Sequence, residues 1–253
     1  MTNVWTIGPI VWIGLAAVVV AGILFARSVR RARRSDDPSP VISITLVIGA
    51  VWAAVSVIGS VIAVLNTLLS PTVTMTVPVA GFWPELPAGV VFGGTTATRL
   101  SGGFTDATLV IADLSTGARM LWATSQGLAI LVPGAIAALI AAACFQLLAG
   151  RVFAPVLARL ARITAIVVAI GGSAAQVLGD VAGGMASSEL FAYTTGGWPE
   201  IAGVEDPLRA WLPRAAAMVN VPFWPLAAGL AFAALATIFR YGSRLQRDTD
   251  GLV

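Results

Sequence analysis

The sequence has no histidine and no lysine, and it has a single cysteine, Cys144. Without histidine, the chain lacks the usual general base near neutral pH and the commonest ligand of transition metals. One cysteine excludes an internal disulfide and a cysteine-based metal site. Because Cys144 lies in an apolar run, we expect it to act as a small buried hydrophobe.

The remaining polar residues show no arrangement typical of catalysis. A Gly-x-Ser-x-Gly motif is absent, and no spacing pairs the scattered serines with acids as nucleophile and base. We therefore predict that the protein is not an enzyme and that it has no catalytic, cofactor-binding or metal-binding residues.

Charge is also scarce. Only 11% of the 253 residues are charged, 58% are hydrophobic and the mean hydropathy is +0.91, whereas a soluble domain carries about 25% charged residues. A helix of about 20 residues crosses the roughly 30 Å hydrocarbon core of a bilayer. Five runs are long and apolar enough: 7–25, 41–69, 128–148, 163–181 and 221–239.

These runs predict an all-α transmembrane helical bundle of five spans with a small extracytoplasmic β-structured insertion. The predicted parts are an N-terminal reverse-anchor span (1–26), an Arg-rich cytoplasmic loop (27–40), the second span (41–69), an extracytoplasmic β-rich subdomain (70–122), the third and fourth spans with a short cytoplasmic loop (123–182), an extracytoplasmic loop (183–220), the fifth span (221–239) and a cytoplasmic tail (240–253).

The arginines predict the orientation. All fifteen basic residues are arginine, and eleven of them fall on one side of the predicted spans. The positive-inside rule makes that side cytoplasmic, so the N-terminus is expected outside and the C-terminus inside a bacterial cytoplasmic membrane.

A cleaved signal peptide is the alternative for the first span. Signal peptides carry their positive charges before the apolar segment, whereas here the charges follow it, which favours an uncleaved anchor.

The extracytoplasmic segments have strand and turn patterns. "PTVTMTVPV" and "TDATLVIAD" are rich in alternating or β-branched residues and are bounded by Gly and Pro, which is typical of short strands. We expect them to form a small subdomain on the outer ends of the second and third spans. In 183–220 we expect a loop with one short helix at Pro207–Trp211. The outer face is predicted to be mildly acidic. It is either a solvated surface or a docking surface for a cation or a basic partner.

Few polar residues lie within the spans. Gln176 and Asp180 recur at a spacing of four in the fourth span and share one helix face. They form a candidate polar face, and Asp180 is either a carboxylate at the outer boundary or a buried functional acid. Small residues at the same spacing, such as Gly49 with Ala53 and Ser56 with Ser60, favour close helix packing.

The short loop after the third span and the C-terminal tail combine apolar residues at helical spacing with arginines. They form a candidate cytoplasmic docking surface, here called the loop–tail surface. Its residues are Arg151, Phe153, Arg159, Arg162, Arg240, Arg244, Leu245 and Arg247. The alternative is that these arginines only set the topology and attract anionic headgroups. Expected partners are the lipid bilayer, a cytoplasmic protein and a second copy of the chain. No nucleic acid is expected, because "RSVRRARR" has no aromatic residues among its charges.

The same two segments resemble a family. A Gly-x-x-Phe-x-Pro turn, a Leu- and Arg-rich entry to a span, and a final Phe-Arg-x-Gly-x-x-Leu with acids resemble a bacterial domain-of-unknown-function family. The matching residues are Gly150, Phe153, Pro155, Leu157, Leu160, Phe239, Arg240, Gly242, Leu245, Asp248 and Asp250. The resemblance implies a small multi-span membrane protein, in some cases encoded beside a small helix-turn-helix regulator, and implies no activity.

The sequence thus favours a non-enzymatic membrane protein with a sensing or regulatory role. Its outer subdomain would bind a signal and its loop–tail surface would bind a partner or lipid. The alternative is a component of a transporter or channel that acts as an oligomer, although no polar path along the spans supports it.

Overall fold

The computed structural model describes residues 40–84, 93–94, 96–151, 153–197 and 207–250, and its account of side chains in the last helix ends at Gln246. The predicted reverse anchor at 1–26 and almost all of the predicted Arg-rich loop at 27–40 lie outside the described residues. So does the predicted first span at 7–25 within the anchor.

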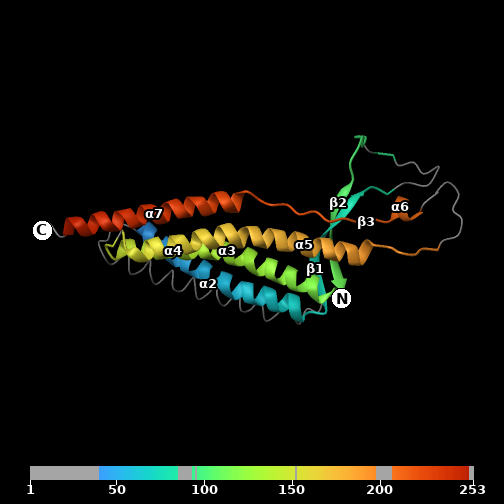
Figure 1. The fold of residues 1–253 in the computed structure, drawn as a ribbon. Coiled ribbons are helices and arrows are strands. Elements are labelled where there is room, and N and C mark those ends of the chain that lie inside the picture. The colour runs from blue at the N-terminus through green and yellow to red at the C-terminus, as the bar shows by residue number, and fades with distance from the viewer. Residues whose placement is uncertain (1–39, 85–92, 95, 152, 198–206, 251–253) are drawn as a thin grey trace. The chain divides into compact units, whose positions relative to one another are not determined.

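Most described residues are helical, with one small sheet (Figure 1). The elements are α2 (Pro40–Leu69), β1 (Thr72–Phe82), β2 (Phe104–Ala112), α3 (Thr116–Leu148), α4 (Pro155–Ile166), the π-helical turn η1 (Val167–Gly171), α5 (Gly172–Phe191), α6 (Pro207–Trp211), β3 (Arg214–Ala215) and α7 (Trp224–Asp250). Within the described part of the chain, four helical segments are long and apolar enough to cross a membrane. The prediction of a mostly helical fold with a small sheet is therefore confirmed, and these four segments are candidate membrane spans.

The helix boundaries differ from the predicted spans at several ends. α2 matches the predicted 41–69, but α3 begins at Thr116, twelve residues before the predicted third span at 128. α4, η1 and α5 run on from Pro155 to Phe191, and α7 extends to Asp250. Hydropathy identifies only the apolar part of a helix, which is the part that contacts lipid. The backbone hydrogen bonds of the helix can continue into polar residues, so the helices are longer than the predicted spans.

Several segments outside the predicted spans are also helix. Residues 116–122 belong to α3 and not to a β-rich segment, and residues 155–162 open α4 rather than a loop. The tail from 240 to 250 continues α7. The predicted short helix at Pro207–Trp211 is confirmed as α6.

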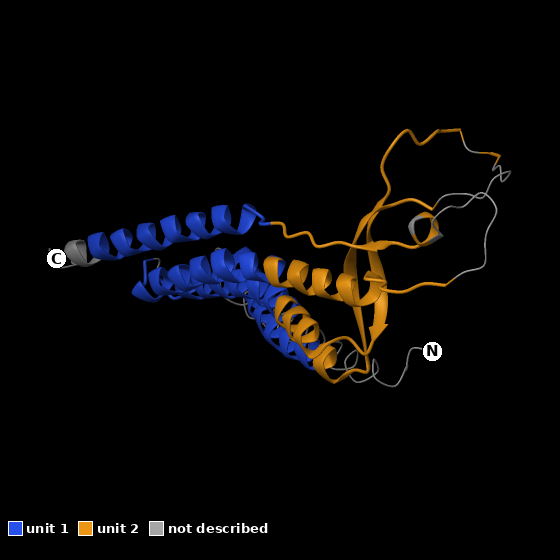
Figure 2. Cartoon of the chain, turned by 45° about the vertical axis from the view of Figure 1, so that its right-hand side comes forward, with its two compact units in different colours: residues 1–65, 126–176, 221–253 blue, residues 66–125, 177–220 orange. Residues whose placement is uncertain are grey.

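The chain divides into two compact units (Figure 2). Unit 1 comprises 1–65, 126–176 and 221–253, and unit 2 comprises 66–125 and 177–220. The helices α2, α3 and α5 each contribute residues to both.

In unit 1, small residues bring α2 and α3 together. A Cβ added at Gly134 of α3 would lie 2.5 Å from the Cβ of Ser56, and one added at Gly49 would lie 2.9 Å from the carbonyl oxygen of Ala137. The hydroxyl of Ser60 donates a hydrogen bond of 3.0 Å to the carbonyl oxygen of Gly127. Residues with no side chain, or a very short one, thus let the two backbones approach closely, as is common between membrane helices.

The same device joins α7 to α4 and η1. A Cβ at Gly229 would lie 2.6 Å from the Cβ of Ala169 and 3.0 Å from the carbonyl oxygen of Ala165. Toward the other end of this contact, Ala161 and Ala236 are buried in a cluster with Leu139 of α3. Apolar side chains on other faces are exposed: Leu230 of α7 is 72% exposed and Trp52 of α2 is 57% exposed. Such faces suit contact with lipid.

Unit 2 contains a three-stranded antiparallel sheet of order β2–β1–β3. Along β1, alternate side chains are buried, from Val73 through Met75 and Val77 to Val79. Val73, Met75 and Val77 pack in one cluster with Ile111, Leu114 and Ala118, and with Ala182 and Ala186 of α5. The predicted strands are confirmed, and the surface that buries the sheet is supplied by residues of α3 and α5.

Gly183 and Ser187 of α5 hold the sheet in place. These residues lie in the segment that was predicted as a loop from its glycines. A Cβ at Gly183 would lie 3.1 Å from the Cδ of Pro78. The fully buried hydroxyl of Ser187 donates to the carbonyl oxygen of Pro78 at 2.6 Å and accepts from the N–H of Ala216 at 3.0 Å. Glycine therefore serves close packing here, and not a turn.

The α2–α3 contact predicts the effect of a single methyl group. Gly134→Ala should lower the free energy of unfolding in detergent by about 1–3 kcal/mol, because the new Cβ overlaps Ser56 and neither backbone can move away freely. Gly59→Ala is the matched control, since the atom nearest its Cβ is the Cγ2 of Ile130 at 3.8 Å. Equal unfolding free energies for the two variants would show that this contact is absent.

Candidate functional site

The site begins with the turn that ends α3. Gly150 has φ +71°, a conformation that costs glycine little. The N–H of Arg151 donates to the carbonyl oxygen of Gln146 at 2.9 Å, and the N–H of Gly150 donates to that of Leu147 at 3.1 Å. These two bonds form a Schellman motif. The motif fixes the backbone of Arg151 directly beside the last turn of α3.

The next residues are fixed at two further points. Ala154 has ψ 134°, the extended conformation imposed on a residue before proline, and Pro155 then starts α4. Between these turns, Phe153 packs against Gly242 of α7, and a side chain at position 242 would occupy the place of the phenyl ring. The loop is thus held by α3, α4 and α7 together.

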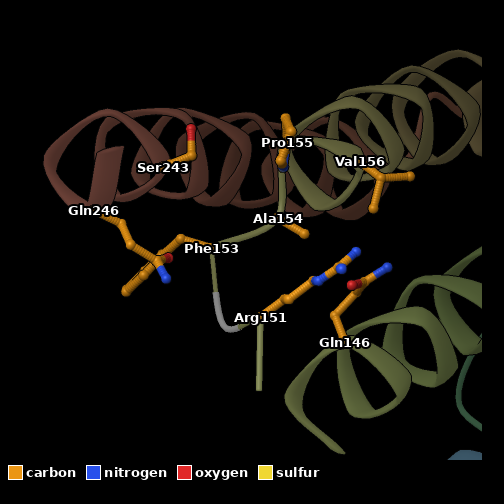
Figure 3. A pocket seen from close by; sticks show the side chains of 8 residues that line it. All are labelled: Gln146, Arg151, Phe153, Ala154, Pro155, Val156, Ser243 and Gln246. Atoms are coloured by element: carbon orange, nitrogen blue, oxygen red, sulfur yellow. The ribbon is translucent and has the colours of Figure 1, made fainter. Parts of the chain in front are cut away.

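An open pocket of about 490 Å³ lies among these elements (Figure 3). The described residues of its lining combine polar and apolar side chains, with no acid among them: Gln146, Arg151, Phe153, Ala154, Pro155, Val156, Ser243 and Gln246. In Figure 3, the guanidinium group of Arg151 and the amide of Gln146 point into the same part of the pocket. Arg151 and Gln246 are exposed, whereas Ser243 is only 5% exposed.

All charged side chains that the structure describes in unit 1 are positive. Unit 1 has five arginines whose side chains are described, at positions 151, 159, 162, 240 and 244, and all five are exposed. The described side chains of unit 1 include no aspartate or glutamate. Asp248 and Asp250 follow on α7, beyond the last described side chain.

The structure brings part of the loop–tail surface together. Arg151 and Phe153 line the pocket, and α4 packs along α7. Arg159, Arg162, Arg240, Arg244 and Leu245 are exposed and are not part of the lining. The side chain of Arg247 lies outside the description.

The candidate polar face of the fourth span has a different setting. Gln176 is exposed, and Asp180 is partly buried. The N–H of Asn220 donates to Oδ2 of Asp180 at 2.7 Å. Asp180 lies in the middle of α5 and not at a helix end. The carboxylate thus binds the backbone at Asn220, shortly before α7 begins. This contact has a structural role.

Sequence reasoning did not assign Gln146, Ser243 and Gln246 to a site. A signal was present for two of them, because Ser243 and Gln246 are three residues apart and share a face once the tail is read as helix. The motif behind the family resemblance also gains a physical meaning. Gly150, Phe153, Pro155 and Gly242 are the residues that shape the loop and its contact with α7.

Unit 2 offers a second exposed surface on its sheet. The face of β1 and β2 away from the core carries exposed threonines at positions 72, 74, 76 and 108. Near the bulged end of the β1–β2 pair, the rings of Trp83 and Phe104 stack at a centroid distance of 5.3 Å, and the guanidinium of Arg99 lies 4.6 Å from the centre of the Trp83 ring. The stack stabilises that end of the hairpin.

No protein-family model, curated protein or solved structure matches this chain. The resemblance to a bacterial domain-of-unknown-function family therefore stays a prediction. Among the described residues, no group of three or more His, Cys, Asp and Glu side chains lies close enough to hold a metal ion.

The contact between Phe153 and Gly242 predicts a measurable coupling. Gly242→Ala should destabilise the protein, because the added methyl displaces the phenyl ring, and Phe153→Ala should remove most of that penalty. Thermal or chemical unfolding of both single variants and the double variant should give a coupling energy of about 0.5–3 kcal/mol. If the effects of the two substitutions on the unfolding free energy were strictly additive, the phenyl ring of Phe153 would not contact position 242.

Proposed function

We propose that this protein is a non-enzymatic, multi-pass protein of a bacterial cytoplasmic membrane with a sensing or regulatory role. It has five spans, with the N-terminus outside and the C-terminus in the cytoplasm. The sheet subdomain of unit 2 binds a signal on the outside, and the loop–tail surface binds a protein partner in the cytoplasm.

One observation carries the proposal: the chain has a small sheet with its own hydrophobic core, and this sheet is built on helices that are otherwise apolar enough to span a membrane. A protein that needed only an anchor would not require a sheet packed against α3 and α5. Because one sheet face is buried and the other exposes threonines and Asp106, the free face is suited to polar contacts with a ligand.

The loop–tail surface supports the second half of the proposal. Its described arginines are exposed, and Leu245, at 69% exposure, adds an apolar side chain between Arg244 and Gln246. A charged surface with an exposed leucine is a common composition for a docking site, in which the apolar contact contributes affinity and the charges contribute the rate of association.

A site-specific cross-linking experiment in living bacteria tests both halves. A photo-reactive amino acid in place of Leu245 should cross-link to a cytoplasmic protein, and one in place of Val110, which is 64% exposed on the sheet, should give only extracytoplasmic products. The same group in place of Leu230, an exposed apolar position on α7, is the control and should cross-link to lipid. Arg240→Gln with Arg244→Gln should reduce the Leu245 product several-fold.

Two results would contradict the proposal. Cross-links from the Val110 position to cytoplasmic proteins would reverse the orientation. A Leu245 product that is unchanged by the arginine substitutions would show that the loop–tail surface is not recognised through its charge.

A further inference from the structure

We propose that the part of the pocket lined by Arg151 and Gln146 binds the phosphate group of one anionic phospholipid. The inference deepens the account of the loop–tail surface and rests on the proposed function in placing this end of unit 1 at the inner surface of the membrane. It concerns a single lipid in a defined pocket, in addition to a partner on the surrounding surface.

The position of the pocket suits a lipid headgroup. Its lining comes from the places where three apolar helical segments begin or end: α3 ends at Leu148, α4 begins at Pro155, and the uncharged run of α7 ends at Phe239, one to two turns before Ser243 and Gln246. Where membrane helices end, the hydrocarbon core gives way to the headgroup layer. A pocket at this level therefore meets lipid phosphates rather than acyl chains alone.

The chemistry of the lining suits a phosphate. Arg151 supplies a planar guanidinium group with several N–H donors, which matches phosphate oxygens well. The amide of Gln146 adds N–H donors, and no acid occurs among the described residues of the lining. The Schellman turn fixes the backbone of Arg151 beside Gln146, and the guanidinium group and the amide point into the same part of the pocket (Figure 3).

The apolar half of the lining suits the rest of the lipid. Phe153, Pro155 and Val156 border the same pocket, and Val156 is 42% exposed. These side chains give the glycerol and the first carbons of the acyl chains an apolar wall. A free inorganic phosphate would leave this wall against water.

The surrounding charge favours a lipid with net negative charge. Five exposed arginines and no acids occur among the described side chains of unit 1. A zwitterionic headgroup brings a positive group into this field, whereas a phosphatidylglycerol headgroup brings none. Each arginine near an anionic membrane surface contributes about 1 kcal/mol of attraction, so a general attraction must be separated from binding in the pocket.

Native mass spectrometry of the purified, delipidated full chain in detergent makes that separation. Titration with phosphatidylglycerol should give one tightly held lipid per chain, and phosphatidylcholine should bind at least about tenfold more weakly. Arg151→Ala should weaken the binding of phosphatidylglycerol about tenfold. Arg159→Ala, which removes the same charge from an exposed position outside the lining, should change it less than about twofold.

Gln146→Ala provides an independent test in the last turn of α3, where alanine is compatible with the helix. It should weaken the binding of phosphatidylglycerol about threefold, as expected for the loss of one neutral donor. Inorganic phosphate at millimolar concentration should not displace the lipid.

Three outcomes would overturn the inference. Equal losses for Arg151→Ala and Arg159→Ala would mean that only general charge attracts lipid. Equal binding of phosphatidylcholine would remove the preference for negative charge. Displacement by inorganic phosphate would make the pocket a site for a free anion. Because the assay contains no protein partner, each of these results is distinct from a failure of the cross-linking at Leu245.

Discussion

Hydrocarbon offers the backbone no hydrogen-bonding partner, and the four helical segments that are apolar enough to span a membrane meet this constraint. Every N–H and C=O within the membrane must be paired along a helix. Lipid also gives two apolar helices little reason to associate, so contact depends on how closely their backbones approach. Gly134 against Ser56 and Gly229 against Ala169 provide that approach. The large apolar side chains then remain on outward faces, where lipid can cover them.

Close approach through glycine recurs in unit 2 with a different purpose. Gly183 lets the backbone of α5 lie against Pro78 and Thr76 of β1. Ser187 bonds the carbonyl oxygen of Pro78 in β1 and the N–H of Ala216, directly after β3. A two- or three-stranded sheet is not stable alone and must bury one face. Helix residues with small side chains supply a flat surface for it. The start of α3 is held nearby by two hydrogen bonds: the N–H of Ser115 donates to the carboxylate of Glu189, and the N–H of Ala118 donates to the hydroxyl of Ser115.

The elements that could be predicted from the sequence are those with a repeating pattern of apolar residues or with clear boundary residues. The alternation of apolar and polar residues identifies β1, and the long uncharged run identifies α2. The acidic residues and proline at the start of α6 identify that helix. The two-residue strand β3 has no period to detect, and α3 and α7 continue past their apolar parts, where hydropathy gives no signal. The glycines at 183 and 184 look like a loop because sequence alone does not reveal the strand packed against them. The pocket was half predicted: Arg151 and Phe153 stood out by charge and spacing, whereas Gln246 required the knowledge that the tail is helical.

The most direct measurement of the central claim, that lipid covers the apolar faces of a helix bundle packed through small residues, is a nitroxide scan of residues 48–61 in α2. Single cysteines would be introduced in a Cys144→Ala background and the protein placed in bilayers. Accessibility to oxygen should be high at Ile48, Trp52 and Val61 and low at Ser56 and Ser60, following the exposed and buried positions of the helix with a period of about 3.6 residues. A water-soluble nickel complex should reach none of these positions. Access of the nickel complex along the whole segment, or oxygen access without a period, would contradict the account.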